Sequence, residues 1–219
     1  MTNLSIIGLC NTQAQLNSLN LLNVICPGVP IAFIASPNAT IQHPGKFQRL
    51  VPKYPVQSPD VDELLWQLPQ LTATEYTVYV DMGAFCKFNP AVLEQAINQH
   101  SLIFSSPFYS RPEFNQMGIP HVGSHFIGFD KSKEAFDFFD NIRDIGRNWS
   151  QISVATCPAS FRVKQLDTEL GLACRLIDPD RKMYPVIDGF VQQPIDVIGN
   201  FLMKSGAPIP PCVLQHRLL

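Results

Sequence analysis

The chain has 219 residues, 46% of them hydrophobic, and a formal net charge of -2. This length and composition predict one large hydrophobic core, and therefore a single domain with at most a small appendage. The near-neutral charge gives no whole-chain electrostatic footprint for binding nucleic acid.

Neither a membrane anchor nor a disulfide framework is expected. The sequence has no run of about eighteen apolar residues. The segment after Met1 lacks the charged start of a signal peptide, so a cytoplasmic location is expected. The six cysteines form no C-x-x-C pair, which argues against zinc-ribbon and thioredoxin-type sites. We expect reduced, mostly buried thiols.

The start of the chain predicts a β-α-β unit. Residues 5–9 predict a strand, Asn11 or Thr12 the N-cap of a helix that ends near Ile25, and residues 29–35 a second strand. Such a unit has a right-handed crossover and a parallel strand pair. The loop after the first strand lacks the G-x-G-x-x-G pattern, which argues against a dinucleotide-binding domain of the usual kind.

Residues 75–85 contain the strand around which we expect the sheet to be organised. Val78–Val80 is β-branched or aromatic, and the run stops at Asp81, as a buried parallel strand does where it ends at a polar edge. Ligands of open α/β sheets bind at the carboxyl ends of strands. Asp81 is therefore a candidate for holding a metal or a ribose, the alternative being that it only caps a turn.

Strand and helix patterns alternate along the rest of the chain, which predicts six or more mostly parallel strands with Val78–Val80 in the centre and helices on both faces. Two glycines in the strand at 121–130 indicate a bulge or a close backbone approach. The expected elements are an irregular excursion at 36–59, helices at 61–68 (N-cap Asp60), 90–99, 132–145 (N-cap Ser132) and 163–176, strands at 101–105, 121–130 and 152–155, a loop at 107–120, and an irregular tail at 180–219 that holds a strand or two and packs over the sheet edge.

This order of elements resembles the GT-A class of nucleotide-sugar glycosyltransferases over roughly residues 3–190. Residues 80–85 resemble the D-x-D motif that binds the metal and the nucleotide diphosphate, with Gly83 in place of the second acid. Residues 122–132 resemble the N-S-G-x-x-x-F strand that lines the donor sugar, without its leading Asn. Residues 167–170 resemble the acidic segment that supplies a general base in inverting members, and His216 stands where some members place a metal- or diphosphate-binding histidine.

The resemblance implies a Rossmann-like GT-A fold and a hexosyl- or pentosyltransferase that uses manganese or magnesium. The base and ribose are expected over residues 9–12, with residues 36–49 closing from above. The residues so implied are Asp167 and Glu169 for catalysis; Cys10, Asn11, Thr12, Arg49, Asp81, Gly83, Gly123 and Ser124 for donor binding; and Asp81 and His216 for the metal. The charge that develops on the leaving diphosphate requires such a metal or a cation, and Lys46 is a further candidate.

Several alternatives remain open. A nucleotidyltransferase shares the β-α-β start, although residues 10–13 carry none of its glycine- and arginine-bearing loop. A non-catalytic GT-A-like binding or assembly module would explain Gly83. An Asp in the setting of Asp167 is usually a helix N-cap, and Arg49 and His216 fit ordinary surface residues. The acceptor is a saccharide, a protein hydroxyl or a hydroxylated DNA base.

Overall fold

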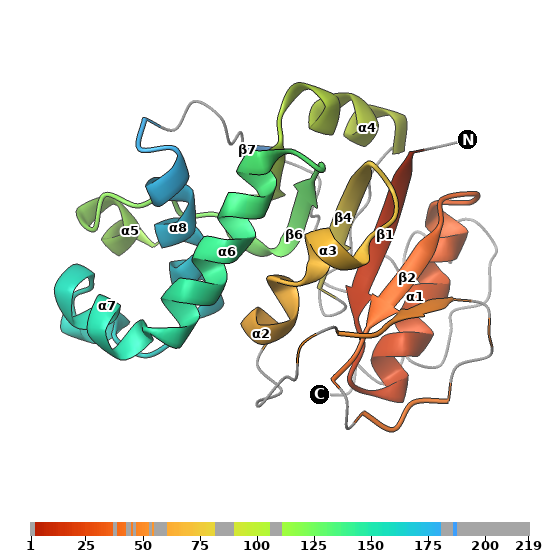
Figure 1. Cartoon of the computed structure of the whole chain (residues 1–219), viewed down its shortest axis with the longest axis horizontal. Coiled ribbons are helices and arrows are strands. Elements are labelled where there is room, and N and C mark those ends of the chain that lie inside the picture. Colours follow the sequence, from red (N-terminus) through yellow and green to blue (C-terminus); the bar gives the residue numbers. More distant parts are fainter. Residues whose placement is uncertain are drawn as a thin grey trace.

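The structure is a computed structural model, and it describes residues 3–36, 39–42, 45, 47–52, 54, 61–81, 90–105, 111–180 and 186–187. Strands in these residues form one seven-stranded sheet, in the order β3-β2-β1-β4-β6-β5-β7 (Figure 1). The strands are β1 (Leu4–Leu9), β2 (Ile31–Ile34), β3 (Gln48–Leu50), β4 (Tyr76–Val80), β5 (Leu102–Ser105), β6 (Gly123–Phe129) and β7 (Val186–Ile187). Only β6 is antiparallel to its neighbours, β4 and β5. The mostly parallel sheet with Val78–Val80 in its centre is therefore confirmed.

Helices lie on both faces of the sheet, as the alternating pattern predicts. In Figure 1, α6 crosses the front of the sheet, and α5, α7 and α8 gather at the left end. The described helices are α1 (Gln13–Ile25), α2 (Val61–Leu65), α3 (Leu68–Leu71), α4 (Pro90–Gln99), α5 (Pro112–Gln116), α6 (Lys133–Arg147), α7 (Trp149–Thr156) and α8 (Leu166–Ile177), with a 3-10 turn at Ala159–Phe161.

Successive residues of the central strands enter two separate cores. Ile6 and Val78 pack with α1 and α4 on one face, whereas Ile7 and Tyr79 pack with α2, α6 and α8 on the other. Side chains alternate across a strand, so a strand that is apolar at every position must be covered on both faces. This is why the apolar run at Val78–Val80 marks the middle of the sheet.

The β-α-β start forms as the sequence predicts. Thr12 is the N-cap of α1, and its side chain accepts a hydrogen bond from the backbone N–H of Gln15 while the Gln15 side chain accepts one from the N-cap backbone. This reciprocal capping box satisfies two N–H groups at the helix start. Ser132 caps α6 with a single bond, in which its side chain accepts a hydrogen bond from the N–H of Ala135.

Three stretches differ from the expectation. Residues 152–155 form part of helix α7 and not a strand, because the chain continues helically from α6 through Asn148, whose carbonyl accepts hydrogen bonds from Gln151 and Ile152. A short apolar run fits a strand or a buried helix equally well by its pattern. The loop at 107–120 contains α5, and the excursion at 36–59 contains β3.

The helix expected at 61–68 is two short helices. Pro69 has no N–H to continue α2, and its ring would clash with a carbonyl of the preceding turn, so the chain restarts as α3 with this proline in its first turn. The expected N-cap, Asp60, lies outside the described residues.

Packing explains Gly128, one of the two glycines in β6. A Cβ there would stand 2.4 Å from Cγ1 of Ile103 and 3.2 Å from Cδ1 of Ile97. The close approach at Gly128 is thus to core side chains of β5 and α4. An irregularity also occurs, where the β5–β6 register shifts between Phe104 and Ser105.

At the far edge of the sheet, β7 pairs in parallel with β5, so the end of the chain does supply an edge strand. The remainder of the expected tail beyond Asp180 lies outside the described residues. Among the described helices, none combines the length and apolarity that crossing a membrane requires.

Candidate functional site

One edge of the sheet collects the predicted site segments. Because β1, β2 and β4 are parallel, the segments that follow them, at Cys10, Ala35 and Asp81, leave the sheet at the same edge. Because β6 is antiparallel, it begins at that edge, at Gly123 and Ser124. We call this the carboxyl edge. It is the edge at which open α/β sheets bind ligands.

The loop after β1 is built around Asn11. Its backbone N–H donates to Gln15 Oε1 at 2.8 Å, and its side-chain Oδ1 accepts from the N–H of Ser36 at 2.9 Å. Gln13 Oε1 also accepts from the N–H of Gln42 at 3.1 Å. These bonds hold Ser36 and Gln42 beside the first turn of α1.

Cys10 and Tyr79 are buried near the carboxyl edge, Cys10 in the core on one face of the sheet and Tyr79 in the core on the other. Cys10 is fully buried, and burial raises the pKa of its thiol to about 12, so the thiol is neutral and not a nucleophile at ordinary pH. Burial also raises the pKa of the Tyr79 phenol, and the charges of Asp81 and Cys10 add to that effect. A ligand contact from Cys10 would therefore have to come from its backbone.

Helix α8 closes on the carboxyl edge through a glycine contact. A Cβ on Gly171 would lie 2.6 Å from the carbonyl oxygen of Pro120 and 3.5 Å from Phe114 Cε1. Only glycine lets the helix come this near to the segment that enters β6. The first turn of α8 is thereby placed beside His121.

Several polar side chains gather around the start of α8. Arg111 Nη1 donates to Gln165 Oε1 at 2.6 Å, which joins the N-cap of α5 to the N-cap of α8. His121 stacks on Phe114, with ring centroids 4.1 Å apart. Burial is the main cause that lowers the pKa of His121; the Asp167 carboxylate opposes this, and the Arg111 guanidinium adds to it.

Asp167 and Glu169 lie in different surroundings although both belong to the first turn of α8. Asp167 is half-buried, and the N-cap is Gln165, so the N-cap interpretation of Asp167 is wrong. Glu169 is 1% exposed, with Oε1 3.8 Å from Lys164 Nζ. An enclosed carboxylate beside a lysine is typical of a structural ion pair.

The described residues do not by themselves make a metal site. Within them, no group of three or more His, Cys, Asp and Glu side chains gathers where a metal could be held. Asp81 supplies one carboxylate. The other expected metal ligand, His216, lies outside the described part of the chain, as do Gly83 and Lys46.

The sheet separates Arg49 from Asp81. Arg49 lies on β3 and pairs with Phe33 of β2. Strands β2 and β1 therefore lie between Arg49 and β4. The fold does bring Asn11, Thr12 and Asp81 to one edge, together with the start of β6. His121 and Arg111 were not predicted from the sequence, because only the packing brings Asp167 and Arg111 close enough to His121 to act on its pKa.

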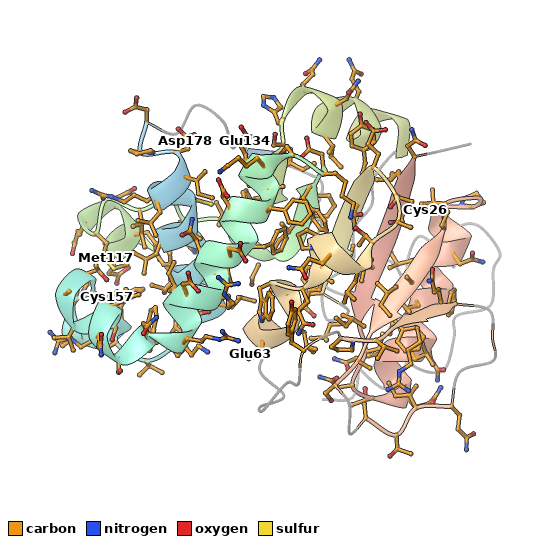
Figure 2. The ribbon with its side chains drawn as sticks, in the orientation of Figure 1. Cys26, Glu63, Met117, Glu134, Cys157 and Asp178 are labelled. Atoms are coloured by element: carbon orange, nitrogen blue, oxygen red, sulfur yellow. The ribbon has the colours of Figure 1, made fainter. Side chains whose placement is uncertain are left out.

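An apolar hollow lies away from the carboxyl edge. An apolar cavity of about 590 Å³ is bounded by α5, α7 and α8, with Met117, Ile152 and Leu172 in its wall and Arg175 at its side. Figure 2 shows Met117 and Cys157 close to this region, at the left end of the molecule. Arg175 is engaged within the fold, since its Nη1 donates to the carbonyl of Gly118 at 2.6 Å.

No protein-family model matches the sequence, and a search of curated proteins finds no match. Solved structures do match. An active-site mutant of LgtC superposes with a TM-score of 0.55 at 12% identity, covering 83% of this chain and 72% of that one. The galactosyltransferase LgtC with donor and acceptor sugar analogues gives 0.51 at 12% identity, covering 77% and 69%. The fold is of the GT-A type.

Nucleotidyltransferases share this GT-A-type architecture. The 2-C-methyl-D-erythritol 4-phosphate cytidylyltransferase from Thermus thermophilus gives a TM-score of 0.52 at 10% identity, covering 93% of this chain and 98% of that one. Identities this low establish the fold and leave the reaction to be argued from the site.

Proposed function

We propose that the protein is a glycosyltransferase that binds a nucleotide sugar at the carboxyl edge and moves the sugar to an acceptor hydroxyl. The observation that carries the proposal is the sheet order, in which the ends of β1, β2 and β4 and the start of β6 share one edge, with the first turn of α8 beside it. Transfer of the sugar requires the donor and the acceptor to bind side by side, and the shared edge places the candidate segments for both together.

Each segment has a role in this proposal. The Asn11–Thr12 loop and the 36–42 segment bind the base and ribose. Asp81 binds a ribose hydroxyl or the diphosphate through a divalent cation. Gly123 and Ser124 line the sugar, because backbone without bulky side chains lets a ligand approach a strand closely.

Asp167 is the better candidate for proton transfer from the acceptor hydroxyl. It is half-buried and near the start of β6, whereas Glu169 is enclosed beside Lys164. A general base must reach the proton that it accepts. The acceptor, whether saccharide, protein hydroxyl or hydroxylated DNA base, is left open.

A divalent cation would bind mainly through the substrate. Magnesium commonly uses one or two carboxylates together with substrate phosphates, and Asp81 supplies one. Manganese dependence is therefore a test of the proposal. We also propose a cytosolic location for the protein. Four cysteines, Cys10, Cys26, Cys157 and Cys174, are buried free thiols, and reduced thiols are usual in the cytosol.

A nucleotidyltransferase is the second candidate function. The observation in its favour is the superposition on the cytidylyltransferase, which spans nearly the whole of both chains. Against it stands the loop after β1, because Asn11 and the glutamine side chains of residues 13 and 15 form protein contacts there in place of a glycine-rich phosphate loop. A non-catalytic module of the same fold is the third possibility.

The test is an Asp81→Ala variant, compared with Asp130→Ala as a control. Asp130 follows β6 at the opposite edge, where its Oδ1 accepts a hydrogen bond from the N–H of Ser132 at 2.9 Å. We expect Asp81→Ala to abolish nucleotide-sugar consumption and to change the free energy of unfolding by at most about 1 kcal/mol. Asp130→Ala should retain consumption per folded molecule.

The assays separate the three functions. Calorimetric titration uses nucleotide sugars with and without manganese, and a parallel assay supplies CTP or dTTP with a sugar phosphate. Diphosphate release only from the mixture of nucleoside triphosphate and sugar phosphate would support the nucleotidyltransferase. Donor binding without turnover would support the non-catalytic module.

If Asp81→Ala melts early and keeps full activity, the site assignment is wrong. Gly83→Asp should raise manganese affinity.

A further inference from the structure

His121 is a polar group at the carboxyl edge that the surrounding fold leaves without a hydrogen bond at one ring nitrogen. Its Nε2 atom is buried, and no described residue offers that atom a hydrogen-bond partner. Buried polar atoms are nearly always hydrogen-bonded, and an unsatisfied one lowers stability. Such an atom beside a candidate site is a place where a ligand can supply the missing partner.

The ring is held firmly in place. Phe114 stacks beneath it at 19° between the ring planes, and Phe114 is fully buried and meets Phe161 edge-on at 5.6 Å. Behind them, the close contact of Gly171 with Pro120 fixes α8 against the segment that carries His121. The imidazole therefore has little freedom to turn toward another partner, which is the rigidity that a specific binding contact needs.

Burial favours a neutral imidazole, because it is the largest cause acting on the pKa of His121. Burial lowers the pKa of His121 most, Arg111 lowers it further, and Asp167 raises it. A neutral imidazole carries one N–H donor and one lone-pair acceptor. A hydroxyl group, which donates and accepts, is satisfied by either arrangement, so a sugar is a better match for this nitrogen than a charged phosphate.

We propose that His121 is a specificity-determining residue whose Nε2 forms a hydrogen bond with a hydroxyl group of the sugar in a nucleotide sugar bound at the carboxyl edge. The inference rests on the proposed function and deepens it by naming the group that reads the sugar. Phe114 positions the ring by stacking on it.

Three variants test this. His121→Phe keeps a ring to stack on Phe114 and removes the nitrogen. His121→Gln keeps an amide at the end of the side chain and is the conservative rescue. Trp66→Phe is the matched control, because the Trp66 Nε1 atom is also buried without a described hydrogen-bond partner but lies between α2 and α3, before β4 begins.

The experiment titrates each variant with UDP-glucose, UDP-galactose and GDP-mannose, and with UDP and GDP alone. We expect His121→Phe to bind the preferred nucleotide sugar about tenfold more weakly, the value of one hydrogen bond, while its affinity for the nucleoside diphosphate stays within about twofold of wild type. His121→Gln should recover part of the loss, and Trp66→Phe should bind like wild type.

Thermal melting distinguishes a binding role of His121 from a structural role, because loss of a structural residue lowers the melting temperature. The melting temperature of His121→Phe should equal or exceed that of wild type, because the unsatisfied nitrogen is gone and the stack is kept. If His121→Phe binds every ligand like wild type, the proposal is wrong and the proposed function stands. Equal loss of nucleotide sugar and diphosphate with a lower melting temperature also overturns it. If wild type binds no nucleotide sugar, the proposed function itself fails.

Discussion

Gly171 of α8 lies against Pro120, so close that a Cβ on the glycine would stand 2.6 Å from the proline carbonyl oxygen. This contact sets the distance between α8 and the segment that enters β6. The same packing of α8 leaves Asp167 close enough to His121 to raise its pKa, although the two residues are far apart in the sequence.

The Gly171→Ala variant should destabilise the protein although alanine is the better helix former. The new Cβ meets a backbone atom, which cannot rotate away, and overpacking of this kind costs roughly 1–3 kcal/mol. Helix propensity returns about 1 kcal/mol at most. Urea unfolding measures the net loss. A variant as stable as wild type would show that α8 can move outward freely.

Gly128→Ala should also destabilise the protein, and here a second substitution should repair the damage. The added Cβ would stand 2.4 Å from Ile103 Cγ1 and 2.7 Å from its Cδ1. We expect a loss of roughly 1–3 kcal/mol for the single variant. Removing Cδ1 with Ile103→Val should recover part of it, so the two changes should be non-additive in a double-mutant cycle. Simple additivity would contradict the packing described for β5 and β6.

Thr168→Val should stabilise the protein. Thr168 is fully buried, and its Oγ1 has no hydrogen-bond partner among the described residues. Valine keeps the branched shape and removes a buried hydroxyl whose desolvation costs about 1–3 kcal/mol when unsatisfied. Chemical denaturation should show a higher midpoint with an unchanged slope. A lower midpoint would indicate that the hydroxyl has a partner in the folded protein.

The His121 contribution to stability should depend on pH with a definite sign. Burial, aided by Arg111 and opposed by Asp167, lowers the folded-state pKa below the ordinary histidine value of 6.5. The unfolded chain therefore binds the proton more readily, and stability that is fully present above about pH 6.5 is lost as pH falls toward the folded pKa.

His121→Phe removes that titration. The stability of wild type relative to His121→Phe should fall as the pH is lowered from about 6.5 toward the folded-state pKa, measured by thermal melting of both proteins in parallel. A difference that stays constant over this range would contradict the direction of the pKa shift. His121→Gln, which also lacks a titrating ring, should behave like His121→Phe in this respect.

Local chemistry in the sequence determined the main elements of this protein. The apolar run at Val78–Val80 had to be covered on both faces and so had to be central, and the caps at Thr12 and Ser132 depend on side chains that satisfy nearby backbone groups. Short-range patterns failed at 152–155, where a short and mostly apolar stretch fits a helix as well as a strand.

Only the tertiary structure decided which polar residues share a site. The antiparallel direction of β6 brings Gly123 to the edge that carries Asp81, and no pattern within the strand itself states that direction. The stack of His121 on Phe114, the bond of Arg111 to Gln165 and the closeness of α8 at Gly171 join segments that are separate in the chain. Contacts of this kind come from packing between elements, which local propensity does not specify, because each segment would form the same helix or strand whatever it faced.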